Sequence, residues 1–216
     1  MPYRADATDL LGELGDPRAV LALIESMLDE EIYLHARKSL LQIGRTAVQP
    51  LAFVAGNKDA PVIFQEKCIR LLAEMEAAEV IPTLIDQLDS SDAGIRMLSA
   101  TVLGKFADSS SKKPLLAVVK RGNAEVDGVI AEAMIALGNF DDKAVHKVLV
   151  KGVEHFSSKV RGSAIIALGR QGRKESVPML IEKLADPAQD NRVLMIQALA
   201  KLGDESAVKP LLSVLE

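Results

Sequence analysis

The sequence predicts an all-α fold: an α-solenoid, a right-handed superhelix of seven stacked antiparallel helix pairs. The first observation is helical periodicity. Between residues 160 and 184, apolar residues recur at i, i+3 or i+4 and i+7 on both sides of a short turn. The second observation is that this helix–turn–helix pattern recurs about every 31 residues. Because so short a pair cannot bury both apolar faces alone, neighbouring copies must cover them.

One position in the turn between the two helices sets the register of the repeats. Intervals of 29, 32, 31, 34, 31 and 31 residues separate its seven occurrences, Gly15, Gly44, Glu76, Ala107, Asp141, Gly172 and Gly203. The residues one, four and twelve places earlier are apolar in 19 of 21 cases. This regularity predicts a single repeat domain over residues 1–216, with repeats near 1–29, 30–58, 59–90, 91–122, 123–155, 156–187 and 188–216.

The helices of each pair follow from the same register. First helices are expected near 5–14, 32–43, 61–75, 93–106, 126–139, 158–171 and 190–202. Second helices open with proline or a short polar stretch, because a first helical turn tolerates a missing N–H. They are expected near 17–28, 46–55, 78–88, 111–121, 142–154, 174–184 and 205–215, and their first core anchors include Val20, Val48 and Val80.

Composition and charge limit the function. Aromatic residues make up 3% of the chain and tryptophan is absent, which favours thin aliphatic layers over a platform for stacking bases. The net charge of −4 does not favour nucleic-acid binding. The single cysteine, Cys68, stands where most repeats have a small residue, so we expect a buried filler, and a catalytic thiol is the alternative. One cysteine allows no internal disulfide, which predicts a reducing, cytoplasmic setting. No apolar run is long enough to span a bilayer, and we expect no membrane partner.

The recurring motif resembles a known family. Val-Arg-x-x-Ala-x-x-Ala-Leu-Gly, followed by x-x-Gly and Ala-Val-Pro-x-Leu, is best preserved from Val160 and Arg161 to Gly172, and Ile95-Arg96 repeats its start. In this motif the chain is similar to the short HEAT-like repeats that are also found in phycobilisome lyase subunits. The resemblance covers nearly the whole chain and implies a solenoid scaffold, whereas it leaves the function open.

The resemblance also implies a role for a recurring arginine. In the family this arginine meets an aspartate of the turn between repeats and forms a structural ladder. Four repeats have arginine eleven residues before the turn position: Arg4, Arg96, Arg161 and Arg192. We interpret these arginines as structural, because an arginine that is bound by carboxylates fixes the end of its helix. Ligand binding is the alternative. Repeats two, three and five have other residues there, so the ladder is incomplete.

No catalytic, cofactor or metal site is expected. None of the three histidines has a His or Cys at i+3 or i+4, the helical spacing for metal ligands. The HEAT-like iron hydroxylases carry His-Glu pairs, and no histidine here precedes glutamate. The HEAT-like DNA glycosylases surround their lesion with aromatic side chains, which are scarce in this chain. We therefore expect a non-enzymatic protein.

Two candidate partner-binding surfaces lie on the second helices, which usually line the concave side of a solenoid. The first is apolar and comprises Leu21, Phe53, Ile81 and Ile85; packing of these residues against a neighbouring helix is the alternative. The second is a basic strip in repeats four and five, comprising Lys113, Lys120, Arg121, His146, Lys147 and Lys151. The strip suits an acidic peptide, a phosphate-rich ligand or nucleic acid, and an ordinary soluble surface is the competing interpretation.

Charge is divided unevenly along the chain. Residues 1–100 carry nine basic and 16 acidic side chains, a net charge of −7, whereas residues 101–216 carry 17 and 14, a net charge of +3. The predicted function is a non-catalytic protein–protein interaction scaffold or regulatory module with a partner of unknown identity. One alternative is a subunit or chaperone of a bilin lyase type complex, implied by the resemblance, and the other is nucleic-acid binding through the basic strip.

The ends of the chain lack the polar capping repeats that a solenoid normally needs. The last repeat, which finishes with Leu211, Leu212, Ser213, Val214, Leu215 and Glu216, resembles an internal one. Two interpretations follow. Either the chain is a segment of a longer protein with further repeats or domains, or its terminal faces associate with another copy or another domain.

Overall fold

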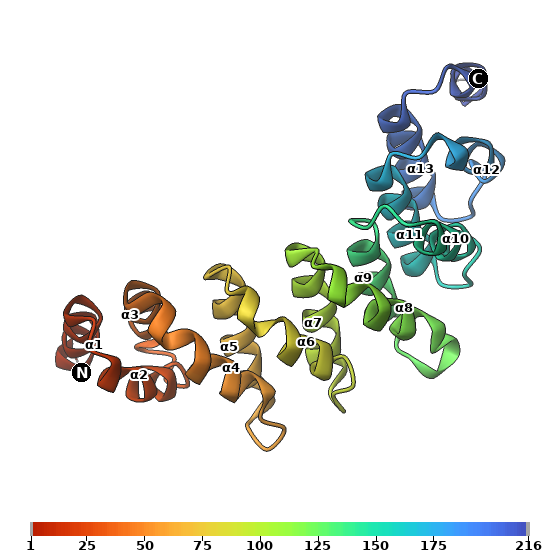
Figure 1. Cartoon of the computed structure of the whole chain (residues 1–216). Coiled ribbons are helices and arrows are strands. Elements are labelled where there is room, and N and C mark those ends of the chain that lie inside the picture. The colour runs from red at the N-terminus through yellow and green to blue at the C-terminus, as the bar shows by residue number, and fades with distance from the viewer. Residues whose placement is uncertain (1, 215–216) are drawn as a thin grey trace. The chain divides into compact units, whose positions relative to one another are not determined.

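The computed structural model describes residues 2–214, and every regular element in this range is a helix, as the sequence predicts. The α-helices follow one another in pairs along the chain (Figure 1). They are α1 Pro2–Leu14, α2 Val20–Ser26, α3 Tyr33–Ile43, α4 Val48–Gly56, α5 Val62–Glu74, α6 Ile81–Gln87, α7 Ala93–Phe106, α8 Lys112–Lys120, α9 Asp127–Leu137, α10 Lys143–Gly152, α11 Ser158–Gln171, α12 Val177–Glu182, α13 Gln189–Leu202 and α14 Val208–Leu212. The predicted end of the last helix at residue 215 lies outside the described residues.

The chain forms two compact units, Met1–Val102 and Leu103–Glu216, here called the first and second unit. Within each unit the first helices stack on one another, α1 on α3 in the first and α9 on α11 on α13 in the second. Second helices pack against the next first helix, as α2 does on α3 and α10 on α11. The predicted repeat boundaries and the handedness of the superhelix stay predictions.

Most second helices begin with a 3₁₀ turn, which makes their α-helical part start one to three residues later than the sequence predicts. These turns are η1 Pro17–Ala19, η2 Gly44–Ala47, η3 Ala78–Val80, η4 Ser109–Ser111, η6 Lys174–Ser176 and η7 Glu205–Ala207. An aspartate side chain caps several of these turns at their N-terminus. The Asp16 carboxylate, for example, accepts a hydrogen bond from the backbone N–H of Arg18 at 2.8 Å.

The turn position that sets the register has a left-handed backbone in six of the seven repeats. Glycine, which adopts this conformation at little cost, has φ between 61° and 71° at Gly15, Gly44, Gly172 and Gly203. Glu76 and Ala107 adopt it with a side chain, at φ 52° and 51°. A side chain strains this conformation because its Cβ approaches the following carbonyl oxygen. The periodic glycine is therefore explained by backbone geometry.

Replacing Ala107 by glycine should stabilise the protein. The change removes the strain of a left-handed alanine, and the larger entropy of an unfolded glycine offsets part of the gain, which leaves about 0.5–1 kcal/mol. The free energy of unfolding, measured by urea denaturation, tests this. Gly172→Ala is the matched control and should destabilise by a similar amount or more, because it introduces the same strain at φ 71°. Stabilisation by both changes, or by neither, would contradict the explanation.

The stacked first helices approach closely because small residues face each other. A Cβ added to Gly12 in α1 would lie 2.6 Å from the Cα of Ser39 in α3, and one added to Gly138 would lie 2.7 Å from the Cα of Ala167 in α11. Such distances leave room for a hydrogen atom only, so the helix backbones are in direct contact. Cys68 stands at another small position of the register, eight residues before the turn. It is fully buried, and burial raises the pKa of its thiol to about 12, which fits a filler in the core.

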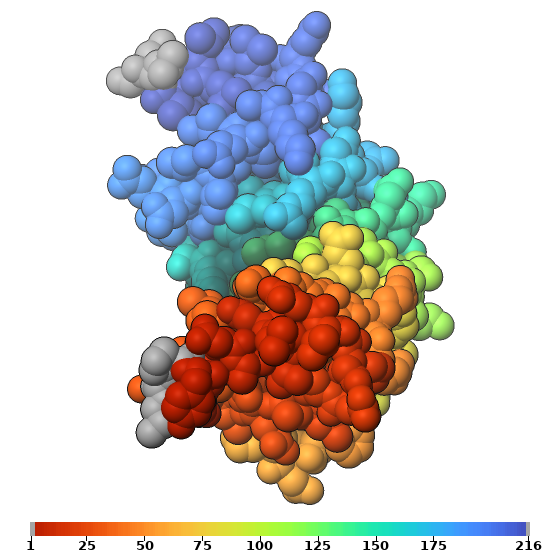
Figure 2. All heavy atoms as spheres, turned by 90° about the vertical axis from the view of Figure 1, so that its left-hand side faces the viewer, coloured from red at the N-terminus to blue at the C-terminus, as the bar shows by residue number. Residues whose placement is uncertain are grey.

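The predicted core positions are buried or half-buried in repeats two to seven and more exposed in the first repeat. The leucine four residues before the turn is fully buried in repeats two to seven, whereas Leu11 in α1 is half-buried. Tyr3 and Leu14, also on α1, are 63% and 68% exposed. Figure 2 shows the reason: the red N-terminal residues lie on the face of the first unit that is turned to the viewer, and no other helix of residues 2–214 covers them there.

Candidate functional site

The apolar surface predicted on the second helices is smaller than expected. α2, α4 and α6 lie next to one another in the first unit, and Leu21 and Phe53 project from them with 65% and 75% of their surface exposed. Ile81, in contrast, is 7% exposed and Ile85 is half-buried. The prediction of an exposed Ile81 was wrong, and the alternative of packing in the core holds for this residue.

The cause is an error of one position in the rotation of α6. Val80, the predicted first core anchor, is buried as expected, but it lies in the 3₁₀ turn η3 and not in α6. Ile81 begins α6 in the way that Val20 begins α2 and Val48 begins α4, and all three are buried. One residue corresponds to about 100° of rotation on a helix, so Ile81 points into the core.

The corrected register reveals which residues share the exposed face. Five residues after the first α-helical residue, α2 has Glu25, α4 has Phe53 and α6 has Asp86, and all three are exposed. Neither carboxylate forms an ion pair among the described residues. Phe53 therefore stands between two acidic side chains on successive helices. We call these three residues the acidic–aromatic row.

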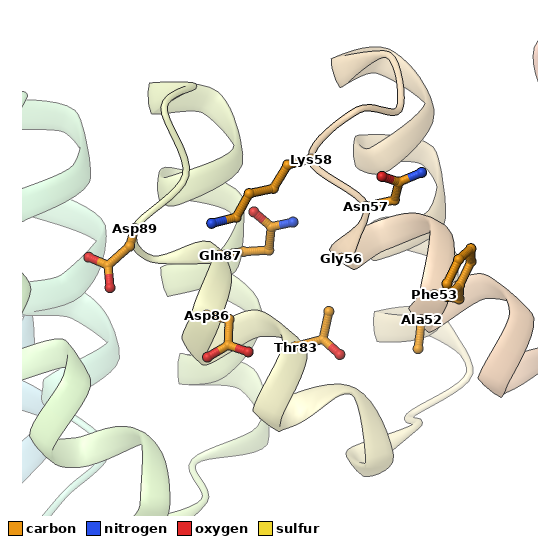
Figure 3. Close-up of a pocket in the computed structure, with 9 residues that line it drawn as sticks. All are labelled: Ala52, Phe53, Gly56, Asn57, Lys58, Thr83, Asp86, Gln87 and Asp89. Atoms are coloured by element: carbon orange, nitrogen blue, oxygen red, sulfur yellow. The ribbon is translucent and has the colours of Figure 1, made fainter.

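An open groove lies beside this row, between α4 and α6 (Figure 3). It has a volume of about 610 Å³. Phe53 forms part of its α4 side, while Thr83 and Asp86 come from α6 (Figure 3). The other lining residues are Ala52, Gly56, Asn57, Lys58, Gln87 and Asp89. Asn57 and Lys58 belong to the linker that follows α4, so the groove combines two helices and one loop of the first unit.

Gln87 supplies a buried polar group to this groove. Its side chain is 2% exposed, and its Nε2 donates a hydrogen bond of 2.6 Å to the carbonyl oxygen of Ala55 at the end of α4. Its Oε1 has no hydrogen-bond partner among the residues that the structure describes. A buried acceptor without a donor is unfavourable, by about 1–3 kcal/mol, so this amide can gain a partner at the groove.

The basic strip predicted in the second unit is reduced to four lysines. Lys113 and Lys120 on α8, and Lys147 and Lys151 on α10, are exposed and have no ion pair in the described part of the chain. α8 and α10 both pack against α9. The exposed positions of α8 and α10 are otherwise occupied by alanine and by Lys143, without a carboxylate. The lysines therefore form two basic helix faces in the second unit.

The other two residues of the strip take part in internal contacts. Arg121 forms an ion pair of 2.9 Å with Glu125, whose side chain is buried. The Nδ1 of His146 lies 2.9 Å from the Oε1 of Gln171, and the Nε2 of Gln171 donates to the carbonyl oxygen of Phe140. The Arg121 pair lies within the linker between α8 and α9, whereas His146 and Gln171 join α10 to α11. Both basic side chains are thus engaged in internal contacts, and their role in partner binding stays a prediction.

The recurring arginines donate hydrogen bonds to two kinds of acceptor, aspartate carboxylates and backbone carbonyl oxygens. Arg4 pairs with Asp29 at 2.7 Å, and Arg161 holds both carboxylate oxygens of Asp186, at 2.7 and 2.9 Å. These aspartates lie in the linker that follows each arginine's own repeat. Arg96 and Arg192 donate to backbone carbonyls of the linker before their helix, Arg96 to Ser90 and Arg192 to Asp186. Arg161 also donates to the carbonyl oxygens of His155 and Phe156, so it joins two successive linkers.

The pair of Arg161 and Asp186 is the most buried of these contacts. Side-chain exposure is 12% for the arginine and 5% for the aspartate. The hydrogen bonds from Arg161 lower the pKa of the Asp186 carboxyl, while burial alone would raise it. The Asp186 carboxylate also accepts hydrogen bonds from the backbone N–H of Ala188 and the side chain of Asn191. It is thus the centre of a small hydrogen-bonded network.

The described residues form neither a metal site nor a membrane-spanning helix. Within this part of the chain, no three His, Cys, Asp or Glu side chains come close enough together to hold a metal ion. No helix between residues 2 and 214 is both long enough and apolar enough to cross a membrane. The candidate features for function on the described surface are the groove with its acidic–aromatic row and the two basic faces.

Stacked helix pairs with exposed second-helix faces define the class of protein: an α-helical repeat scaffold. The HEAT repeat model matches residues 50–138, 123–192 and 146–216, and the model of the PBS lyase HEAT-like repeat matches residues 3–29. The chain therefore belongs to the HEAT repeat family. A comparison with curated proteins finds no match.

Solved structures of other repeat proteins share the fold. The complex of CpcE and CpcF of phycocyanin lyase from Nostoc sp. PCC7120 matches with a TM-score of 0.60 at 17% identity, over 90% of this chain and 80% of that one. A designed armadillo repeat protein matches with a TM-score of 0.54 at 17% identity, over 86% and 99% of the two chains. An engineered protein matches with a TM-score of 0.54 at 19% identity, over 97% and 67%. At these identities the likeness concerns the fold alone.

Proposed function

We propose that this protein is a non-catalytic scaffold that binds a protein partner on its second-helix faces. The observation that carries the proposal is Phe53, a large aromatic side chain that is 75% exposed beside a groove. Large exposed apolar groups next to a concavity are typical of protein-binding sites. Membership of the HEAT repeat family supports the proposal, and the single buried cysteine is compatible with a cytoplasmic setting.

Replacing Phe53 by aspartate should weaken partner capture without unfolding the protein. The side chain contributes little to the core because most of it is exposed. A charge at its place would instead oppose an apolar contact with the partner. Affinity capture from the source cell, quantified by mass spectrometry for wild type and variant side by side, measures the effect. We expect at least about a tenfold loss of the captured partner, which corresponds to about 1.4 kcal/mol.

Leu34→Asp is the matched control for this experiment. Leu34 lies on the first helix α3 and is 67% exposed, so the substitution makes the same chemical change outside the second-helix face. It should leave capture unchanged. Equal capture by the wild type and Phe53→Asp would remove Phe53 from the binding surface.

The basic faces of the second unit form a second candidate surface, which would select an acidic segment of the partner. An acidic segment is favoured because the four lysines have no ion pairs among the described residues and their helices expose no carboxylate. Lys147→Glu combined with Lys151→Glu should slow association at low salt by about tenfold or more, and this difference should fade near 0.5 M salt because screening shortens the reach of charges. Surface plasmon resonance with the captured partner measures the rates.

Nucleic-acid binding through the same lysines is the alternative for this surface. It predicts retention of radiolabelled nucleic acid on a filter at low salt and a steep loss of affinity with added salt. The double variant serves as the control. Absence of retention at low salt would end this alternative and leave the acidic protein segment.

A role as a subunit of a bilin lyase type complex is a further alternative. It draws on the match of residues 3–29 to the PBS lyase HEAT-like repeat and on the fold shared with the complex of CpcE and CpcF. Co-expression with a phycocyanin subunit and a bilin-producing pathway tests it. A coloured adduct that depends on this chain would favour the lyase-type role over a general scaffold.

A further inference from the structure

We propose that the groove between α4 and α6 binds an extended segment of a partner protein that carries Arg or Lys on both sides of one apolar side chain. This inference rests on the proposed scaffold function and names the chemistry of the segment that occupies the first unit. Three independent features of the groove support it: charge, an exposed aromatic ring and an unsatisfied amide.

The charge of the surface favours a basic segment. Glu25 and Asp86 flank Phe53 on the neighbouring helices and have no ion pair among the described residues. Lys58 is the one basic residue among those that line the groove. Residues 1–100, which include all of these groups, have a net charge of −7. An acidic segment would be repelled from this surface, whereas a basic one is attracted.

Phe53 supplies the apolar contact at the centre of the row. An aliphatic side chain of the segment gains by covering its exposed ring. An arginine that approaches Glu25 or Asp86 can also lie over the ring face, where the guanidinium group is attracted by the aromatic electrons. An aromatic ring between carboxylates therefore favours binding of a segment that has both apolar and cationic side chains.

Gln87 adds a hydrogen-bond acceptor at the wall of the groove. Its Oε1 is buried without a donor, while its Nε2 is committed to the carbonyl oxygen of Ala55. An extended segment has free backbone N–H groups, and an arginine has five side-chain donors. Binding of either group gives Gln87 the partner that the described residues do not supply. In Figure 3, Gln87 lies between Lys58 and Asp86 on the α6 side of the groove.

The spacing of the row predicts the spacing of the segment. Packed helices lie about 8–10 Å apart, and an extended chain advances about 3.3 Å per residue. Successive members of the row should therefore meet every third residue of the segment. The expected pattern is basic, two residues of any kind, apolar, two residues of any kind, basic.

Fluorescence anisotropy with synthetic peptides and the full chain tests this pattern. The probe is a labelled peptide with a central leucine, arginines three residues before and after it, and alanines elsewhere. We expect saturable binding that weakens at least about tenfold for a peptide with both arginines moved next to the leucine, and no binding for a peptide with glutamates in place of the arginines.

Charge-neutral variants locate the site. Glu25→Gln combined with Asp86→Asn should weaken binding of the probe at least about tenfold. Asp6→Asn combined with Glu13→Gln removes the same charge from exposed positions of α1 and should change binding less than about twofold. Equal weakening by both pairs would show attraction by the overall charge only, and would overturn the proposal, as would binding of the glutamate peptide.

Two further results separate this inference from the scaffold function. If no arginine peptide binds, but capture of the partner still depends on Phe53, the inference is wrong and the scaffold function stands. If capture is independent of Phe53, the scaffold proposal for this face fails. The basic faces of a second copy are a competing occupant. Sedimentation equilibrium in which the Glu25 and Asp86 variant abolishes self-association would assign the groove to that copy and overturn the proposal.

Discussion

Leu137→Asp is expected to unfold the repeats of the second unit around α9. Leu137 is completely buried in α9, where first helices stack in direct contact with α11. An aspartate there would be an unpaired charge in an apolar layer, and such a change costs about 4–5 kcal/mol or more. Solenoid repeats are stabilised by their nearest neighbours, so the loss of one layer also exposes the layers beside it.

Circular dichroism and urea denaturation measure the effect of Leu137→Asp. We expect reduced helicity and a lower melting temperature. Leu34→Asp is the control, since the same change at an exposed position of α3 should shift the free energy of unfolding by no more than about 0.5 kcal/mol. A Leu137→Asp variant that kept full helicity and its melting temperature would show that the repeat register is wrong.

Asp186→Ala should have the second largest effect. Asp186 is the buried carboxylate that compensates Arg161, and it also accepts hydrogen bonds from Ala188 and Asn191. Its removal leaves a buried guanidinium group without its counter-ion, which costs about 3–5 kcal/mol. Glu79→Ala is the control, because its partner Arg45 is largely exposed and an exposed pair contributes about 1 kcal/mol at most.

The pH dependence of this effect has a definite sign. The pKa of Asp186 is lower in the folded protein than in the unfolded chain, where an aspartate has a pKa of about 3.9. Its contribution to stability is therefore complete above this ordinary pKa and is lost as the pH falls through the lower, folded pKa. Wild type and Asp186→Ala should differ by a constant amount above about pH 5 and converge in stronger acid. Denaturation curves from pH 2 to 7 test this, and a difference that grew in acid would contradict the role of the pair.

The fold was predictable from the sequence because its signals are local. Apolar residues at helical spacing, and a turn position that favours glycine, need only a few neighbouring residues to be recognised. The structure explains the two departures from glycine, Glu76 and Ala107, as side chains in the same left-handed conformation. Cys68 was likewise identified as a filler from its place in the register, and it is buried.

The candidate site was predictable only in part. Leu21 and Phe53 were placed correctly on an exposed face, whereas Ile81 proved to be a core anchor. The sequence contained the signal for the correction: Ile81 stands five residues after its turn position, as Val20 and Val177 do after theirs. With that spacing, Asp86 would have been recognised as the neighbour of Phe53. Gln87 could not have been found, because its unsatisfied oxygen depends on how α6 meets α4.

The sequence by itself thus determined the class, the helix pairs and the close approach of the first helices, since each follows from periodicity along the chain. Only the tertiary structure decided the rotation of the short second helices and which charged side chains form internal contacts. One residue turns a helix face by about 100°, which is enough to exchange an exposed position for a buried one. Arg121 and His146 were basic candidates in the sequence, and packing gave them Glu125 and Gln171 as partners. The surface left for a partner is what remains after such internal contacts are made.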